Sequence, residues 1–180
     1  MASTTTRLTI DDFERLPDEE ARGHELVDGE LVDVSGNNPE HNLLRDFLIE
    51  LLRPLVRKAR LGVVLSEQEF DFEGDAHGPD VVFFSSAKQA LLSRLQRVQR
   101  FVPDLAVEII SPNNIFKDLV RKKDRYLRCG TAEVWLVSPD DRSVYVYSEN
   151  RKAILSGNDE LSTPLIPGFA ISVDNLFTQA

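Results

Sequence analysis

The sequence predicts an α/β fold in which a mixed β-sheet is flanked by helices. Two observations lead to this class. Short runs of strand-forming apolar residues recur along the chain as in a meander, and amphipathic segments of helical period stand before and after the central runs. With 180 residues, 42% of them apolar, the chain is long enough to bury a core as one domain over residues 1–180.

The first third of the chain is predicted to hold a short helix, a hairpin and the main core helix. Residues 9–20 have an amphipathic pattern, with Thr9 as the N-cap. Residues 25–34 place an Asp-Gly turn between two short apolar runs, which is typical of a β-hairpin. From residue 39 to about residue 60, apolar side chains recur with a helical period, so this segment is predicted to be the long helix on the core.

The middle of the chain alternates strands with one helix. Residues 62–72 are predicted to form a strand, residues 74–78 a loop, and a second strand begins at Asp80. Apolar side chains on one side of residues 87–100 and arginines elsewhere predict a surface helix. Residues 101–110 return to a strand.

The C-terminal part is predicted to begin with a helix over residues 115–128. Asn113 and Asn114 are suited to cap its start, and Gly130 is suited to follow its end. Short edge strands then lead to the closing segment. Two further strands are predicted at residues 133–137 and 143–147, with a turn between them at residues 139–142. The closing segment is predicted at residues 175–177.

Composition excludes several classes of protein. No apolar run is long enough to cross a bilayer and the N-terminus lacks an apolar signal core, so we expect a cytoplasmic protein without membrane contact. The single cysteine, Cys129, excludes an intramolecular disulfide and a cysteine-based zinc site. With only three histidines besides, any metal ion is expected to bind through oxygen.

Two carboxylates interrupt apolar strand segments. Asp80 opens one such segment and Glu108 lies inside another. Burying a carboxylate is costly unless a positive group meets it. Strand alternation puts each acid on a face that otherwise looks buried. If the two strands are neighbours, this pair suits Mg²⁺, which takes one or two carboxylates and keeps several waters.

The basic segment after Glu108 contains the candidate positive partner. On a helical wheel both Lys122 and Lys123 fall within or beside the apolar stripe, so at least one should point toward the sheet. The wheel does not choose between them. Two acids and a lysine around a metal ion are the parts of a metal-dependent phosphodiesterase, because that reaction needs an activated water and neutralisation of growing charge.

The net charge of −9 argues against broad electrostatic attraction to nucleic acid. Basic residues are nevertheless concentrated in residues 94–100 and 117–128. Such runs are usually solvated helix faces. The site candidates have similar structural interpretations: Asp80 as a turn residue, and Lys122 as an exposed lysine paired with Asp118 one turn earlier.

Six segments, taken together and in order, resemble a known family. They are residues 25–31, 39–41, 79–81, 103–112, 118–126 and 130–137. These segments are similar to the putative restriction endonuclease family that is abundant in cyanobacteria, which belongs to the PD-(D/E)XK nuclease superfamily. The resemblance covers nearly the whole chain, so it is more specific than any one motif.

The resemblance implies a restriction-endonuclease-like fold in which Asp80 and Glu108 bind a divalent metal ion, Mg²⁺ or Mn²⁺. The usual superfamily lysine lies two residues after the second acid, where this sequence has Ile110. The family instead places a lysine on the following helix, four residues before its tyrosine, and this spacing selects Lys122. Glu25 corresponds to the acid of the N-terminal region, and His41 to the histidine at the start of the long helix.

The function expected from these residues is endonuclease cleavage of nucleic acid, with DNA as the first choice of substrate. A homodimer is expected, since two sites related by symmetry suit the cutting of two strands. One alternative is a relative of the same fold that has lost catalysis and acts as a binding or assembly module, which fits the acidic charge. Another is a nuclease acting on RNA or on a different phosphodiester. Glu25 and His41 have the further alternative of plain strand-entrance and helix-start residues.

Overall fold

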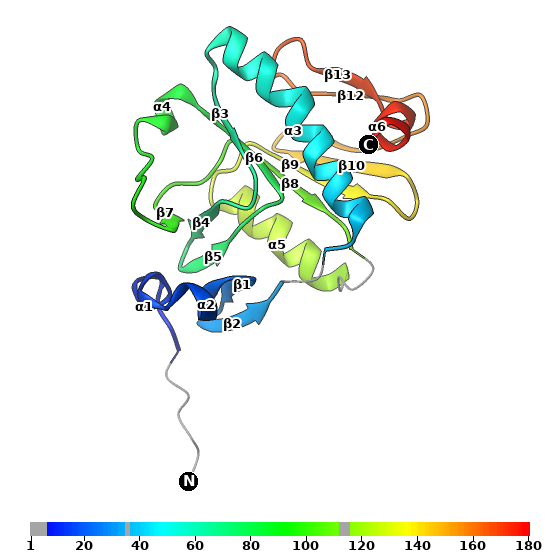
Figure 1. Ribbon diagram of the computed structural model, residues 1–180. Helices are drawn as coiled ribbons and strands as arrows, with labels where there is room; N and C mark the ends of the chain where they lie inside the picture. Colours follow the sequence, from blue (N-terminus) through cyan, green and yellow to red (C-terminus); the bar gives the residue numbers. More distant parts are fainter. Residues whose placement is uncertain (1–6, 35–36, 112–115) are drawn as a thin grey trace.

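The largest sheet of the protein is mixed, as the sequence predicts. In a computed structural model that describes residues 7–34, 37–111 and 116–180, this sheet has six strands (Figure 1). In spatial order they are β11 (Lys152–Ser156), β10 (Ser143–Ser148), β9 (Glu133–Ser138), β8 (Leu105–Ile109), β6 (Val81–Ser85) and β3 (Gly62–Leu65). β8 and β9 are parallel, and the other neighbours are antiparallel. Helix α5 (Phe116–Arg128) makes the crossover that the parallel pair requires.

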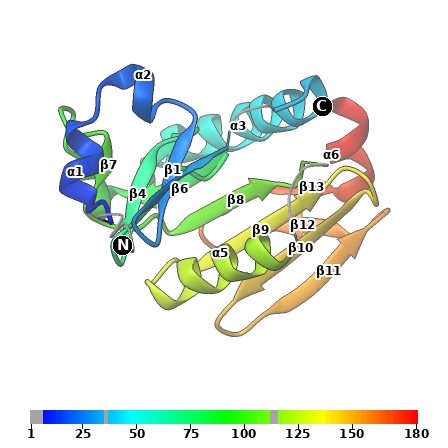
Figure 2. The ribbon, with the colours of Figure 1, turned by 90° about the horizontal axis from the view of Figure 1, so that it is seen from below.

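Helices cover both faces of this sheet. Figure 2 shows α3 (Pro39–Ala59) on one side of β8, β9 and β10, and α5 on the other. The C-terminal helix α6 (Val173–Gln179) lies on the α3 side, and its Leu176 joins the same core cluster as Leu48 and Trp135. A second cluster lies between the sheet and α5 and is centred on Tyr126. Each face of the sheet thus has its own apolar core.

A smaller sheet lies beside the first and holds the N-terminal hairpin. Its five strands, in spatial order, are β2 (Glu30–Asp33), β1 (His24–Val27), β5 (Asp75–His77), β4 (Glu69–Phe72) and β7 (Val98–Gln99). The short helices α1 (Ile10–Arg15) and α2 (Asp18–Ala21) pack on it through a third apolar cluster. A two-stranded sheet, β12 (Glu160–Ser162) with β13 (Ala170–Ser172), precedes α6.

Several predicted elements are confirmed. The hairpin turns at Asp28-Gly29 with both φ angles positive, 49° and 80°, which is the turn that Asp-Gly favours. The long helix is confirmed with Asn38 as its N-cap. Strands β9 and β10 and helix α5 match their predicted segments, whereas β8 covers only the second half of the strand predicted over residues 101–110. The predicted caps Asn113 and Asn114 lie outside the described residues. The closing segment is the helix α6.

Two predicted elements are each divided in the structure. The helix predicted over residues 9–20 is two helices, because Leu16 precedes a proline and is held in an extended conformation with ψ of 144°. The strand predicted over residues 62–72 becomes β3 and β4 in different sheets. Glu67, between them, has a positive φ of 53°, which reverses the chain out of the first sheet.

Two other predictions are wrong. Residues 74–78 are not a loop, because Glu73 and Gly74 form a tight turn and Asp75–His77 returns beside β4 as the strand β5. Residues 87–100 are not a helix beyond the single turn α4 (Ser86–Gln89). The buried Gln99 side chain binds the backbone of Ser93 and Gln96, which closes this segment into a loop.

No helix of the described residues is long and apolar enough to cross a membrane.

The α3 core predicts a contrast between two leucines of one helix. Leu48 is fully buried and Leu43 is 57% exposed. We expect Leu48→Ala to lower the free energy of unfolding by about 2 to 5 kcal/mol, because it leaves a cavity between α3 and the sheet. Leu43→Ala should change it by less than about 0.5 kcal/mol. Urea denaturation of both variants measures the difference, and equal losses would contradict the described packing.

Candidate active site

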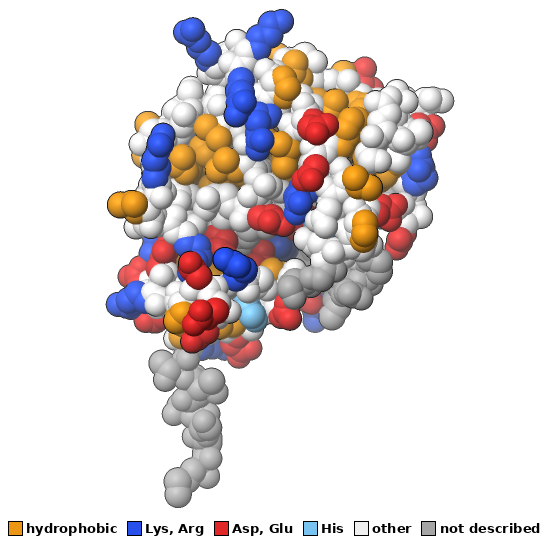
Figure 3. All heavy atoms as spheres, in the orientation of Figure 1, with side chains coloured by type: hydrophobic (Ala, Val, Ile, Leu, Met, Phe, Trp, Pro, Cys, Tyr) orange, Lys and Arg blue, Asp and Glu red, His pale blue; other side chains and the backbone are white. Residues whose placement is uncertain are grey.

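A cleft of about 1120 Å³ opens between the N-terminal hairpin, the end of β8 and helix α5. Figure 3 shows acidic and basic side chains gathered where the N-terminal elements meet the rest of the chain. All five candidate residues from the sequence, Glu25, His41, Asp80, Glu108 and Lys122, line this cleft. They come from four secondary-structure elements and from the segment just before β6.

Asp80 and Glu108 enter the cleft from adjacent strands. Glu108 is the next-to-last residue of β8, and Asp80 immediately precedes β6, the antiparallel neighbour of β8. Oδ2 of Asp80 accepts a hydrogen bond of 2.6 Å from the backbone N–H of Ile109, so the two acids are joined through the β8 backbone. The predicted juxtaposition of these two carboxylates is present.

His41 lies behind Asp80. The Asn38 side chain accepts a hydrogen bond of 2.8 Å from the backbone N–H of His41, and this cap starts α3 so that the imidazole points to the cleft. Nε2 of His41 lies 3.1 Å from Oδ1 of Asp80, and the His41 side chain is only 3% exposed. Both oxygens of Asp80 are therefore held in place.

Glu25 is held from the opposite wall by the last residue of β5 and the residue that follows it. It lies on β1, next to β5, and its Oε2 is 2.9 Å from Nδ1 of His77. Its Oε1 accepts a hydrogen bond of 3.0 Å from the backbone N–H of Gly78. Glu25 and His77 are both almost fully buried. The strand β5, predicted as a loop, is what fixes the Glu25 carboxylate.

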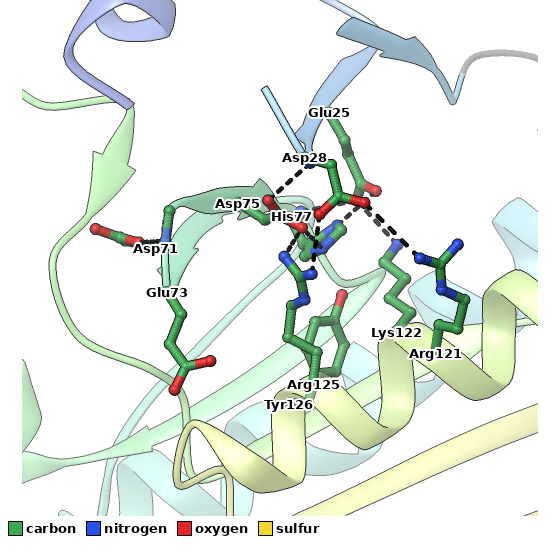
Figure 4. Close-up of polar contacts among 12 residues, drawn as sticks. Glu25, Asp28, Asp71, Glu73, Asp75, His77, Arg121, Lys122, Arg125 and Tyr126 are labelled. Carbon is green, nitrogen blue, oxygen red and sulfur yellow. Dashed lines mark hydrogen bonds and ion pairs between the residues drawn. The ribbon is translucent and has the colours of Figure 1, made fainter. Parts of the chain in front are cut away.

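Lys122, not Lys123, reaches the acids. Its Nζ lies 2.9 Å from Oε1 of Glu25 and 3.1 Å from Oε1 of Glu108, so one ammonium bridges two carboxylates (Figure 4 shows Lys122 and Glu25). Lys123 instead lies over the ring of Tyr147 and contacts Asp124. The family spacing, which selects Lys122 over Lys123, agrees with this geometry.

Tyr126, one turn after Lys122, completes the set. Its hydroxyl donates a hydrogen bond of 2.7 Å to Oε1 of Glu108. Its ring stacks on Phe72 with centroids 4.2 Å apart, which fixes the phenol beneath the cleft. Burial and the nearby Glu108 carboxylate raise the pKa of Tyr126 well above its usual value, so it remains a donor.

The charges of this cluster divide unequally among its acids. Burial raises the pKa of Glu108 to about 7, and the repulsion of Asp80 and Glu25 adds to this despite the attraction of Lys122. Burial also opposes ionisation of Glu25, but Lys122 and His77 outweigh it and hold the Glu25 pKa below its usual value. Burial opposes the charge on Lys122 too, yet the two carboxylates raise its pKa above the usual value. The surroundings thus favour the charged forms of Lys122 and Glu25 and disfavour ionisation of Glu108.

The donor set of the cleft fits a hard cation. The described residues contain no group of three or more His, Cys, Asp or Glu side chains arranged to hold a metal ion. Asp80 and Glu108 supply two carboxylates. Oε1 of Glu108 contacts both the Tyr126 hydroxyl and the Lys122 ammonium, whereas Oε2 of Glu108 and the two oxygens of Asp80 each contact one of the groups described and keep a lone pair for a cation. Two carboxylates with water as the remaining ligands is the usual arrangement for Mg²⁺. The residues therefore fit a magnesium or manganese ion and not a zinc cage.

Residues that the sequence did not single out also contribute to the cleft. His77 lay in a segment that looked like a loop between two glycines. The sequence predicts Tyr126 only as a member of the apolar stripe of its helix and as the tyrosine four residues after the family lysine. Glu69, on β4, also lines the cleft, and it was hidden inside the long predicted strand. The one local signal for the β4–β5 turn, and so for the strand that carries His77, was Gly74, which adopts the positive φ of a hairpin turn without strain.

Glu69 gives a pH prediction that is separate from the acid pair. Burial raises its pKa to about 7 against the attraction of Arg97, and Glu25 and Glu14 add repulsion. A carboxyl with a raised folded-state pKa stabilises the fold most below pH 4.5, and that contribution is lost as the pH rises toward 7.

Glu69→Gln should therefore stabilise the protein at pH 8 by about 1 kcal/mol, a value reduced for the partial exposure of the group. At pH 5 the gain should be much smaller. Urea denaturation at the two pH values measures the difference. A gain that is the same at both would contradict a raised pKa.

Comparisons with known proteins agree with this arrangement. A crystal structure described as "a putative nuclease belonging to DUF820 from Anabaena variabilis" has a TM-score of 0.83 and 20% sequence identity, covering 95% of this chain and 98% of that chain. At this identity the likeness shows the fold. No curated protein matches the chain. The family described as "Uma2: Putative restriction endonuclease" matches residues 10–174, so the chain belongs to that family.

Proposed function

We propose that this protein is a metal-dependent endonuclease that hydrolyses phosphodiester bonds in nucleic acid, with DNA as the substrate. The observation that carries the proposal is the Lys122 ammonium between Glu25 and Glu108, beside an Asp80 that is bonded to the same strand end. Membership in the family described as "Uma2: Putative restriction endonuclease" supports it.

In this proposal Asp80 and Glu108 hold one Mg²⁺ or Mn²⁺ ion. When bound, that ion supplies a more acidic water and neutralises charge on the phosphate. Lys122 orients the attacking water or stabilises the negative charge that grows on the phosphoryl oxygens. Its raised pKa keeps the ammonium charged through the working pH range.

The other residues of the cleft act by positioning. His41 holds Asp80, His77 and the Gly78 N–H hold Glu25, and the Tyr126 hydroxyl holds Glu108. Glu25 keeps Lys122 charged and pulled toward the sheet. A homodimer would place two such clefts by symmetry for the two strands of a duplex.

The rival function is a binding or assembly module of the same fold without catalysis, which the net charge of −9 favours. Such a module has no need for a cation between Asp80 and Glu108. The first test therefore asks for both metal binding and cleavage.

Asp80→Ala and Glu108→Ala should each abolish magnesium-dependent nicking of supercoiled plasmid by the purified protein, because each removes half of the metal donor set. Gel electrophoresis of the plasmid measures nicking, and calorimetric titration with Mn²⁺ measures the loss of metal binding. Equal nicking by the wild type and both variants would point to a contaminating nuclease. Absence of metal binding by the wild type would favour the assembly module.

The two adjacent lysines offer a matched comparison. Lys122→Ala should reduce the nicking rate by roughly 100-fold or more, in the range for removing one preorganised charge-stabilising group, while Mn²⁺ still binds. Lys123→Ala should leave the rate within about threefold, because Lys123 packs on Tyr147 outside the acid pair and such a contact contributes little. Rates are measured at saturating metal after circular dichroism confirms folding. Equal losses in both variants would exclude a specific role for Lys122.

A further inference from the structure

Helix α5 presents a row of arginines along the rim of the cleft. Arg121, Arg125 and Arg128 follow each other at spacings of four and three residues, so they lie on one side of the helix, and all three line the cleft. Arg121 and Arg128 are well exposed, with 64% and 58% of the side chain accessible. Figure 4 shows Arg121 and Arg125 extending from α5 toward the hairpin, beside Lys122.

Each arginine of this row contacts a carboxylate on a turn. The guanidinium of Arg121 lies 3.8 Å from Asp28, on the β1–β2 turn, and Arg125 lies 3.4 Å from the same acid. Arg128 lies 3.1 Å from Glu73, on the β4–β5 turn. Both acids are more than half exposed. Exposed pairs of this kind contribute little to stability, so another anion can replace the carboxylate at low cost.

We propose that this arginine row binds consecutive phosphates of the nucleic-acid backbone, and that Asp28 and Glu73 stand in for those phosphates when the cleft is empty. The inference rests on the proposed function, because it assigns the substrate contacts of the same cleft. It explains how a chain of charge −9 holds a polyanion. The attraction is local to one helix, and the turn acids mask it until substrate arrives.

The dimensions and chemistry of the row suit this ligand. From Arg121 to Arg128 the helix rises roughly 10 Å. Phosphates of one strand follow each other at about 3.4 Å of rise along the duplex axis and lie further apart than this because the strand also winds around it, so the row is long enough to meet about two phosphates. Guanidinium groups also bind phosphate oxygens in a bidentate manner. Arg125 differs from its neighbours because it also contacts the buried Asp75 on β5, so its main role is to fix α5 against the smaller sheet. Arg121 and Arg128 are the residues free to exchange partners.

The test is fluorescence anisotropy with a labelled duplex DNA, without divalent metal so that no cleavage occurs. Arg121→Ala with Arg128→Ala should weaken binding and reduce the slope of log K against log salt by about 1.8, since two phosphate contacts are lost. The matched control, Arg57→Ala with Lys58→Ala, removes the same charge from exposed positions in the last turn of α3, at the end opposite to His41. It should change neither the affinity for DNA nor the salt slope. Arg121→Lys with Arg128→Lys, which keeps the charge, should restore most of the salt slope.

The masking acids give the opposite change. Asp28→Asn with Glu73→Gln should tighten binding by about 2- to 30-fold, because two exposed ion pairs no longer compete with phosphate. Asparagine suits the positive φ of residue 28, so the hairpin turn is kept. The control Glu149→Gln with Glu160→Gln removes the same charge from two exposed positions outside the cleft. It should have a smaller effect.

The outcomes separate this inference from the proposed function. If the wild type nicks plasmid through Asp80 and Glu108 but binds DNA no better than Arg121→Ala with Arg128→Ala does, the arginine row is not the phosphate site and the nuclease stands. If binding depends on the arginine row while nicking does not depend on the acid pair, the inference stands and the nuclease falls. Failure of the wild type to bind DNA at all would overturn the inference.

Discussion

The bridge that Lys122 makes between Glu25 and Glu108 is the interaction on which the rest of the cleft depends. It joins three separate parts of the fold: the hairpin of the smaller sheet, a central strand of the larger sheet, and the crossover helix. Carboxylates buried this deeply are costly without an opposite charge. Removing the ammonium would leave Glu25 and Glu108 facing each other and Asp80. Removing one partner of a buried ion pair destabilises a protein more than replacing the whole pair by apolar residues does. The cleft is therefore a structural joint as well as a place for chemistry.

The same bridge explains why the acids differ in behaviour. Glu25 has a second positive or donating partner in His77 and a backbone N–H from Gly78, whereas Glu108 has the Tyr126 hydroxyl and two carboxylates nearby. One ammonium cannot fully stabilise both carboxylates. Glu25 accepts more hydrogen bonds, which favour its ionised form, whereas the pKa of Glu108 is raised. A hard cation at Glu108 and Asp80 would supply the charge that the protein itself lacks there. The unequal pair is thus consistent with a site that is completed by a metal ion.

Local sequence signals predicted those parts of the fold that depend on local physics. Asp28-Gly29 specified its turn, and the apolar period of residues 39–60 specified α3. The choice of Lys122 over its neighbour came from the family spacing, because both lysines lie near the apolar stripe. Sequence patterns failed where distant contacts decide. The leucines of residues 87–100 have a helical period, yet Leu95 is 97% exposed and Gln99 closes the segment as a loop. β5 has little strand propensity of its own and exists because β1 and β4 flank it.

The distances along the chain between the partners of the Lys122 bridge have a consequence for biosynthesis. Glu25 and Lys122 are separated by 97 residues, and Glu108 emerges before the lysine does. On the ribosome, the hairpin and the first strands of both sheets are made before the Lys122 ammonium that bridges Glu25 and Glu108. A fragment ending before α5 keeps the contacts of Glu25 with His77 and of Asp80 with His41, but Glu108 has neither Lys122 nor the Tyr126 hydroxyl. The joint between the two sheets is therefore completed only after translation of the crossover helix, and until then the nascent chain exposes surface that chaperones bind.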